Sequence, residues 1–406
     1  MAKVSQKNKI RRNIILRALL DNGQMSLTEI RDKTGITIPV ASGIINSLKK
    51  KNLIIEVKQQ DAKQAGRPPY LVKLNGKAGY ILGVDLGRVY NNIVVLDLEQ
   101  NVIHYDRKKI YLLGNEEDVL GKITDELDRI LREANLSWDS CLGIGFSIPG
   151  IVNGPEGTSD TYLKIGDKPL RQTLREYFNK PVHIEHDVKS MTLGELWFGE
   201  AKQTSNSLCL KVDYGIGLGI IIDGKIYYGN NSYSGEFGHI SVVNNGKLCY
   251  CGKRGCLETV ASGRFLVEEA KERIAEGIQT LLMKQEEGDI ENINQRNIIE
   301  CANNGDEFCI ELLEEAAKNL GIGCATLINL FDPAKIILAG EIGNLVSKLF
   351  VDQMKSTARK KSLMQLNKNV EFVSSTLGSK AGALGVAMLA ARDLFEIEHL
   401  NPFSYF

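Results

Sequence analysis

Apolar residues at the start of the chain recur with the spacing of a helix that buries one face. Between residues 6 and 20 they form one stripe, while Lys and Arg cover the remaining surface, and the run 21–23 (Asp-Asn-Gly) then favours a helix end. Ser26 and Glu29 have the spacing of a capping box, in which each side chain accepts a hydrogen bond from the other residue's backbone N–H. A second, short helix that ends at Gly35 is therefore predicted.

A third helix is expected directly after this glycine. Thr37 can cap it, Pro39 suits its first turn, and three apolar side chains are spaced to pack inward, namely Ala41, Ile45 and Leu48. Two extended runs follow, at residues 52–57 and 70–74. Three helices followed by two strands are typical of a winged helix-turn-helix, which we predict for residues 1–78.

From residue 79 onward the pattern changes to strands separated by glycine-rich turns. A three-stranded meander, an amphipathic helix and a buried strand are predicted first, at residues 80–87, 92–98, 101–110, 116–134 and 141–147. A similar set follows, with long helices between residues 263 and 329 and strands at 206–213, 217–223, 225–228 and 335–339. This repetition predicts an α/β body of two related lobes.

Charge divides the chain into two parts. The 406 residues carry no formal net charge, but residues 1–78 contain 16 Lys or Arg and 5 Asp or Glu, a balance of +11 that leaves −11 for the remainder. A basic segment on an acidic body fits a DNA-binding domain attached to a metabolite-binding one. The apolar runs are too short to cross a bilayer and no secretory signal is found, so a cytoplasmic protein is expected.

One imidazole and three thiols lie within eighteen residues, the set that zinc needs for a closed tetrahedral site. Glycines at 252 and 255 allow the loop to turn back on one ion, and the predicted ligands are His239, Cys249, Cys251 and Cys256. Three sulfurs and one nitrogen with no open position are typical of structural rather than hydrolytic zinc. The alternative is that the thiols are free or form disulfides, and the lack of a secretory signal disfavours disulfides.

The same stretch resembles the signature of a known family. Glu236-x-Gly-His239, a spacer of nine residues, and Cys-x-Cys-Gly-x-x-Gly-Cys-x-Glu258 look like the motif of the ROK family, whose members are bacterial sugar kinases and sugar-responsive repressors. The resemblance implies a two-lobed ATPase-type body of the actin and hexokinase (ribonuclease H-like) fold. The first lobe would be residues 79–184, completed by a C-terminal helix at 380–406, and the second lobe, with the zinc loop, would be residues 185–379.

The loops that hold ATP in kinases of this family depart here from the family's pattern. Where those kinases have Asp-x-Gly-Gly-Thr, this chain has Asp85-Leu-Gly-Arg88-Val89, so a side chain obstructs close approach of backbone to phosphate. The second loop, Gly215-Ile-Gly-Leu-Gly, has lost its hydroxyl, and the third reads Ala-Gly-Glu341, which places a carboxylate on the nucleotide side. ATP binding is therefore not expected, which leaves the structural zinc as the expected cofactor.

The sugar side of the family's site is better preserved. Glu185-His186-Asp187 resembles a Glu-Asn-Asp motif whose aspartate accepts a proton from the sugar hydroxyl in kinases and hydrogen-bonds that hydroxyl in any member. Asp187 would be catalytic only in a kinase, and its alternative role is to cap the following helix. Ser147-Ile-Pro-Gly resembles the loop beneath the sugar, and the predicted sugar ligands are Asn153, His186, Asp187, Glu236, His239 and Glu258.

DNA would be read by the third helix of the N-terminal domain. Its outward residues suit contacts to base edges and phosphates in a major groove, although each also fits a solvated helix face, and they are Thr37, Ser42, Asn46 and Lys49. Arg67 belongs to a Gly-Arg-Pro-Pro run in which proline keeps the backbone extended, so its guanidinium is expected in a narrow A·T minor groove. Family repressors carry a similar Gly-Arg-Pro segment.

These features together predict a repressor of genes for sugar uptake or catabolism, which binds operator DNA as a homodimer or homotetramer and is released by a sugar or sugar phosphate. The alternative is an ATP-dependent sugar kinase with a DNA-binding extension, which Asp187 favours and the altered nucleotide loops oppose. His186 resembles the Mlc branch of the repressors, which implies a third alternative, control by a membrane sugar transporter. Thr161 stands where the kinases commonly have asparagine, so the sugar itself is not identified.

Overall fold

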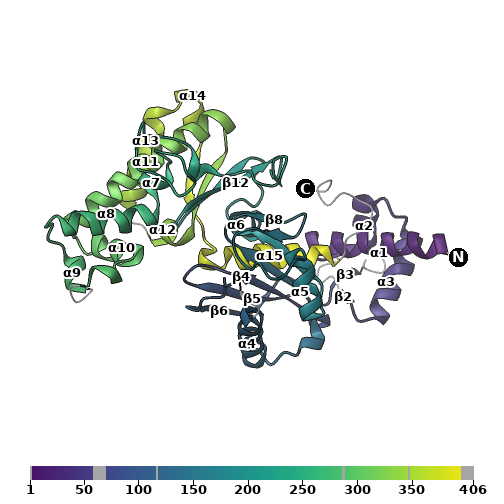
Figure 1. Ribbon diagram of the computed structural model, residues 1–406. Helices are drawn as coiled ribbons and strands as arrows, with labels where there is room; N and C mark the ends of the chain where they lie inside the picture. The colour runs from purple at the N-terminus through teal and green to yellow at the C-terminus, as the bar shows by residue number, and fades with distance from the viewer. Residues whose placement is uncertain (1, 58–69, 116–117, 286–288, 346–347, 395–406) are drawn as a thin grey trace. The chain divides into compact units, whose positions relative to one another are not determined.

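The computed structural model describes residues 2–57, 70–115, 118–285, 289–345 and 348–394 (Figure 1). The chain forms two compact units. Unit 1 consists of Met1–Ser190 together with Gly382–Phe406, and unit 2 of Met191–Ala381. The lobe borders predicted after residues 184 and 379 stay predictions, and each unit is described by itself below.

The N-terminal module of unit 1 consists of three helices and a small antiparallel sheet of strand order β1-β3-β2: α1 (Ala2–Asn22), β1 (Met25–Ser26), α2 (Leu27–Thr34), α3 (Ile38–Lys50), β2 (Ile54–Val57) and β3 (Leu71–Leu74). The predicted capping box is confirmed, because Ser26 N–H donates to the Glu29 carboxylate at 2.7 Å and Glu29 N–H donates to the serine hydroxyl oxygen at 3.2 Å. Thr37 precedes α3 as its N-cap but makes no capping hydrogen bond, so this detail of the prediction is wrong. The inward side chains of α3 are buried as predicted: Ala41, Ile45 and Leu48.

The rest of unit 1 is a five-stranded sheet between helices, with the order β10-β7-β4-β5-β6. Its elements are η1 (Gly76–Ala78), β4 (Tyr80–Asp85), β5 (Asn91–Asp97), β6 (Val102–Lys108), α4 (Asp118–Glu133), η2 (Trp138–Ser140), β7 (Cys141–Ile148), β8 (Val152–Asn153), β9 (Thr158–Ser159), α5 (Leu170–Phe178), β10 (Val182–His186) and α15 (Ala381–Asp393). Apolar side chains of β4, β5 and β7 form a core with α4 and α5. The other face lies against α15, and glycine is needed there: a Cβ on Gly83 would lie 2.1 Å from the Ala383 carbonyl oxygen, and one on Gly145 2.2 Å from that of Val386.

Unit 2 contains a sheet of order β13-β12-β11-β14-β15 and a larger helical layer. Its elements are α6 (Asp187–Phe198), which begins in unit 1, β11 (Ser207–Val212), β12 (Ile216–Ile222), β13 (Lys225–Ile226), η3 (Phe237–His239), α7 (Glu258–Ala261), α8 (Gly263–Ala275), α9 (Leu281–Gln285), η4 (Ile290–Asn292), α10 (Gln295–Asn303), α11 (Glu307–Phe331), β14 (Lys335–Ala339), α12 (Gly340–Leu345), α13 (Lys348–Lys361), α14 (Met364–Asn367), β15 (Glu371–Ser374) and η5 (Gly378–Lys380). One core joins β11, β12 and β14 to α8, α10, α11 and α13.

The two sheets share one plan. Each sheet contains an antiparallel meander (β4-β5-β6 or β11-β12-β13) and two further strands on the side of the meander's first strand. The nearer of these (β7 or β14) pairs in parallel with that first strand, and the outer one (β10 or β15) pairs in parallel with the nearer one. The prediction of two related lobes is confirmed by this common order. Within the part of the chain that the structure describes, no helix combines the length and apolar character needed to cross a membrane.

Candidate metal centre and binding sites

The loop that carries the predicted metal ligands runs from η3 to α7 and folds back on itself. Two isolated bridges hold its arms together, Ser241 with Cys256 and Leu248 with Arg254. The turn requires Gly255, whose φ is +74° and whose added Cβ would lie 1.8 Å from the Val243 carbonyl oxygen. Local sequence therefore forces the last cysteine back toward the histidine that begins the loop.

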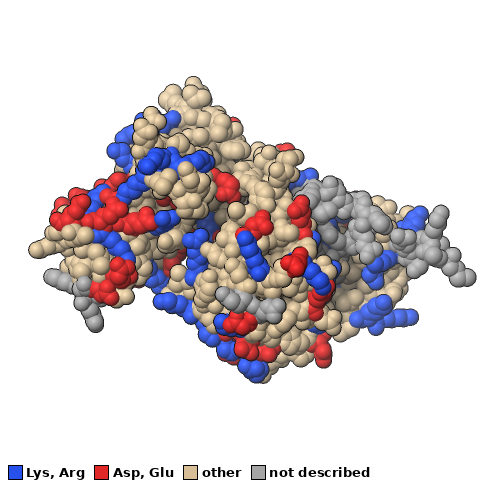
Figure 2. Space-filling model, in the orientation of Figure 1, with Lys and Arg blue, Asp and Glu red and all other residues tan. Residues whose placement is uncertain are grey.

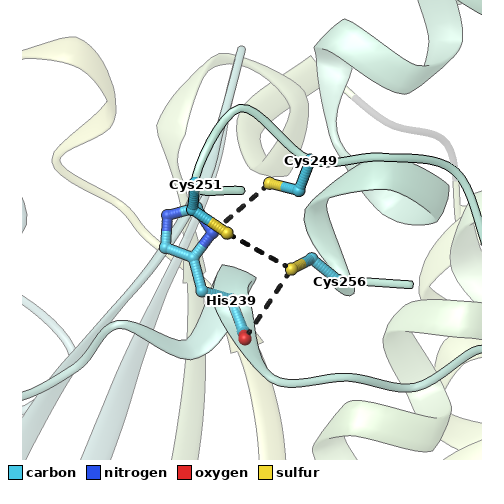
Figure 3. A group of neighbouring side chains, drawn as sticks. All are labelled: His239, Cys249, Cys251 and Cys256. Carbon is cyan, nitrogen blue, oxygen red and sulfur yellow. Dashed lines mark hydrogen bonds between the residues drawn. The ribbon is translucent and has the colours of Figure 1, made fainter. Parts of the chain in front are cut away.

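All four predicted ligands converge (Figure 3), and their candidate ligand atoms lie within 4.8 Å of one another. Cys249 Sγ is 3.6 Å from His239 Nδ1, and Cys251 Sγ is 3.6 Å from Cys256 Sγ. With Zn–S bonds of about 2.3 Å and a Zn–N bond of about 2.0 Å, a regular tetrahedron requires S–N and S–S separations of about 3.5 and 3.8 Å. The donor set and both spacings therefore fit zinc held through Nδ1 of the imidazole.

The three thiols differ in burial and acidity. Cys249 and Cys256 are buried and Cys251 is exposed. Burial and hydrogen bonds with the neighbouring thiols raise the pKa of Cys256 to about 12, and burial raises the pKa of Cys249. Burial opposes ionisation of Cys251 as well, but the backbone N–H of Lys253 and the other thiols lower its pKa below the ordinary value. A metal would therefore have to displace protons from the thiols as it binds, most of all from the two buried ones.

The predicted sugar ligands of unit 2 lie next to this loop. His239 points its second nitrogen, Nε2, away from the sulfurs, and Glu236 has a carboxylate oxygen 3.9 Å from it. Glu258 follows the last cysteine and is buried, with one carboxylate oxygen accepting a hydrogen bond from Ile216 N–H at 3.0 Å. The loop thus positions all three residues, and one of them is tied to strand β12.

The predicted sugar ligands of unit 1 lie at the carboxyl end of β10. His186 Nε2 is 3.3 Å from Asp187 Oδ1, and both side chains are largely buried. Asn153 is buried on β8, where its side-chain oxygen accepts from Glu156 N–H at 3.2 Å. The glycine after it lies against β10, because a Cβ on Gly154 would be 2.8 Å from the Glu185 carboxylate. Unit 1 thus brings its three predicted ligands to one end of the sheet, which is where open α/β sheets bind ligands.

A hydrogen-bonded group at the neighbouring strand ends was not predicted. The Ser147 hydroxyl donates to Asp85 Oδ1 at 2.6 Å, and Asn92 donates to Oδ2 at 3.3 Å. Tyr105 in turn donates to the side-chain oxygen of Asn92 at 3.0 Å. Asp85 and Ser147 lie side by side because of the parallel register of β4 and β7. Asn92 and Tyr105 come from the antiparallel strands β5 and β6, so their place in this group depends on the register of the meander, which the sequence pattern does not give.

The third of the altered loops is held by side chains of unit 2. Glu341, at the start of α12, accepts two hydrogen bonds from Arg296, at 3.1 and 3.3 Å. The Gln295 amide donates to both Glu341 at 3.1 Å and Asp213 at 2.8 Å. These contacts link the turn after β11 to the starts of α10 and α12. The Glu341 carboxylate, which the sequence places on the nucleotide side, therefore accepts hydrogen bonds from Gln295 and Arg296 of the same unit.

Three of the predicted DNA-reading residues lie on α3, and Thr37 lies directly before it as the N-cap. Thr37 and Asn46 are exposed, and Ser42 is half-buried. Lys49 forms an ion pair of 2.5 Å with Glu56 on β2, so part of its charge is compensated within the module. Figure 2 shows Lys and Arg side chains at the surface around α3. Arg67 lies outside the described residues.

Comparisons with known proteins agree along nearly the whole chain. A model described as the ROK family matches residues 81–393. The xylose repressor of Caldicellulosiruptor bescii is 30% identical over 393 residues, which cover 96% of this chain and 97% of that protein. A solved ROK-family transcriptional regulator, a homologue of the Escherichia coli Mlc protein, is 26% identical with a TM-score of 0.78, covering 96% of this chain and 98% of its own. A ROK-family glucokinase from Streptomyces griseus, solved with glucose and AMPPNP, is 28% identical with a TM-score of 0.66, covering 77% of this chain and 99% of its own.

Proposed function

The chain belongs to the ROK family, and from that premise we propose that it is a sugar-responsive transcriptional repressor. The observation that carries the proposal is the extent of the matches. The family model begins at residue 81, after the basic N-terminal module, whereas the xylose repressor matches 96% of the chain and so extends into that module. A protein that pairs a sugar-binding body with a basic helical module has the parts that sugar-controlled DNA binding needs.

The N-terminal module is proposed to be a winged helix-turn-helix that reads operator DNA through α3. Support comes from Asn46, which is exposed on α3, and from Thr37, which is exposed directly before it. The opposite side of α3 is buried against the module. Arg67, which lies outside the described residues, is predicted to enter a narrow A·T minor groove. Two copies in a homodimer or homotetramer would bind half-sites a whole number of helical turns apart, about 10 base pairs each.

The effector is proposed to be a sugar or sugar phosphate. Support comes from the two groups of polar residues, one at the end of β10 in unit 1 and one beside the metal loop in unit 2. Hydrogen bonds from sugar hydroxyls to carboxylates, and between hydroxyls and imidazole, are contacts that a polyhydroxylated ligand makes. That both groups hold one ligand stays a prediction. A membrane sugar transporter as an additional protein partner also stays a prediction.

Zinc is proposed to be structural. The residues that would hold it are His239, Cys249, Cys251 and Cys256, and when bound it would supply a fixed link across the loop that presents Glu236 and Glu258. The chain's own residues do the rest: Glu258 is fastened to β12 through Ile216 N–H, and Gly255 lets the loop fold back.

The alternative function, a sugar kinase, is disfavoured by the contacts of its nucleotide loops. Asp85 accepts hydrogen bonds from Ser147 and Asn92, and Glu341 is paired with Arg296 and Gln295. A nucleotide would have to compete with these internal partners as well as with the side chains of Arg88 and Val89. Asp187 alone keeps the position of a catalytic base.

The proposal is tested by selecting DNA from a random duplex library with the full chain. A palindromic site should emerge, and Asn46→Ala should relax base preference within the half-site by about 1–3 kcal/mol. Gln24→Ala, an exposed polar residue of the same module outside α3, serves as the matched control and should leave the preference unchanged. Selection of no common sequence by the unaltered protein would contradict a repressor.

A further inference from the structure

Tyr250 stands between two of the predicted zinc ligands, yet its side chain faces the histidine. It is 63% exposed, and its hydroxyl oxygen lies 3.2 Å from His239 Nε2. The two rings meet edge to face, with centroids 5.2 Å apart and an interplanar angle of 82°. The guanidinium of Arg264 lies 5.7 Å from the centroid of the tyrosine ring. An exposed aromatic side chain is thus held beside one imidazole nitrogen.

The chemistry of a metal-bound imidazole decides the direction of this hydrogen bond. Nδ1 of His239 is the nitrogen that faces the sulfurs, at 3.6 Å from Cys249 Sγ, so its lone pair would go to the metal. The proton then stays on Nε2, which must donate it to an acceptor. Glu236 is too distant for a hydrogen bond at 3.9 Å, whereas the Tyr250 hydroxyl oxygen is within range.

We propose that Tyr250 is a positioning residue that orients His239 for zinc and occupies, in the sugar-free protein, the place of a sugar hydroxyl at Nε2. The proposal rests on the proposed sugar-binding function. Because the tyrosine side chain is mostly exposed, its displacement uncovers little buried surface. A sugar hydroxyl that replaces it accepts the hydrogen bond from Nε2 and can donate its own proton to Glu236. Sugar and tyrosine therefore compete for one nitrogen.

The positioning role is measured by zinc release, which requires no knowledge of the sugar. Zinc-loaded protein is mixed with a chromogenic chelator, and the rate of transfer is compared between the unaltered protein and Tyr250→Phe. Loss of an outer-shell partner of a ligating histidine typically costs about 10- to 100-fold in metal affinity, so release should be faster by at least about 10-fold. Tyr227→Phe, in an exposed tyrosine of the same unit, should not change the rate. An unchanged rate in Tyr250→Phe overturns the proposal.

The competition is measured by calorimetry with xylose, glucose, N-acetylglucosamine and their phosphates. Tyr250→Phe keeps the ring but removes the competing oxygen, so it should bind the recognised sugar about 2- to 10-fold more tightly. The sugar should also slow zinc release from Tyr250→Phe toward the rate of the unaltered protein, because its hydroxyl restores an acceptor for Nε2. Weaker sugar binding in the variant would show that Tyr250 is itself a sugar contact and would overturn the competition.

The two hypotheses fail separately. If the unaltered protein binds none of these compounds, the sugar-binding function is contradicted, and zinc release still decides whether Tyr250 orients His239. If the unaltered protein binds a sugar and Tyr250→Phe matches it in both affinity and zinc release, sugar binding stands and the role of Tyr250 is refuted.

Discussion

Exchange of Arg392 for methionine should weaken the effect of sugar on operator binding without unfolding the DNA-binding module. Arg392, near the end of α15, reaches the last turn of α1, where its guanidinium lies 3.4 Å from Asp21. The amide of Gln100 donates to the Leu20 carbonyl oxygen in the same turn. At the other end of α15, a Cβ on Gly382 would lie 2.7 Å from the Asp85 carboxylate, which Ser147 also contacts. This helix therefore connects the strand ends of unit 1 with α1.

The size of the effect follows from burial. The Arg392 side chain is 10% exposed and that of Asp21 is 34% exposed. A fully exposed ion pair would contribute little, but a pair with one buried partner should have a coupling energy of about 1 kcal/mol. Since 1.4 kcal/mol corresponds to a factor of ten, about 1 kcal/mol corresponds to roughly fivefold. Allosteric coupling energies are typically about 1–3 kcal/mol, so such a loss is a large share of the whole.

The assay compares operator dissociation constants with and without saturating sugar, by fluorescence anisotropy. Arg392→Met and Asp21→Asn should each reduce the ratio of the two constants by roughly fivefold, and the double variant should reduce it no further. Arg31→Met, which breaks an exposed pair with Asp32 on α2, is the matched control and should leave the ratio unchanged. Equal ratios in the unaltered protein and in all three coupling variants would refute a role for this contact.

Three further outcomes are expected. Metal analysis should find one zinc per chain, and Cys251→Ser should lose most of it. Cys324→Ser, which changes a buried cysteine of α11, should retain the zinc. Full zinc content in Cys251→Ser would mean that the ligands are misassigned. A coupled ATP assay over hexoses, pentoses and amino sugars should detect no turnover near 1 per second, a rate normal for an enzyme, and turnover of that order would overturn the repressor-only account. Burial opposes ionisation of Glu126, but hydrogen bonds from Arg129 and Lys108 hold its pKa below the ordinary value. The charged carboxylate therefore stabilises the fold at pH values above the unfolded pKa of about 4.3. This contribution is lost as the pH falls through the lower folded pKa. Glu126→Gln should therefore lower the melting temperature at pH 7 and flatten its decline in acid, and an unchanged acid profile would count against this carboxylate.

Elements with a strong local signal were predicted well. The strand predicted at 335–339 is β14 (Lys335–Ala339), because a fully buried strand is a continuous apolar run. The C-terminal helix expected at 380–406 is present as α15 (Ala381–Asp393), and residues 395–406 lie outside the described ones. The grouping of His239 with the three cysteines was also predictable, since all four candidate ligands lie in one short loop and two glycines define its turns.

Contacts between distant segments were not predictable from the pattern. Arg296 and Glu341 are 45 residues apart, and the sequence around neither residue indicates that the two form a pair. The sequence suggests that Lys49 is available for contacts with DNA. In the structure, Glu56 on β2 lies beside Lys49 and forms an ion pair with it. The sequence gives no reason to single out Tyr250, because the position between two predicted ligand cysteines carries no requirement of its own. Only the direction of the His239 ring gives Tyr250 a partner.

The central claim, that sugar controls DNA binding by this chain, is tested most directly by titrating the complex of the full protein with its selected operator duplex. The complex should weaken steeply with salt, because Lys and Arg release counterions from phosphate. At fixed salt, one sugar or sugar phosphate of the panel should raise the dissociation constant by at least about 5-fold, the low end of typical allosteric coupling, while zinc remains bound. An operator affinity that no sugar or sugar phosphate changes would contradict the account.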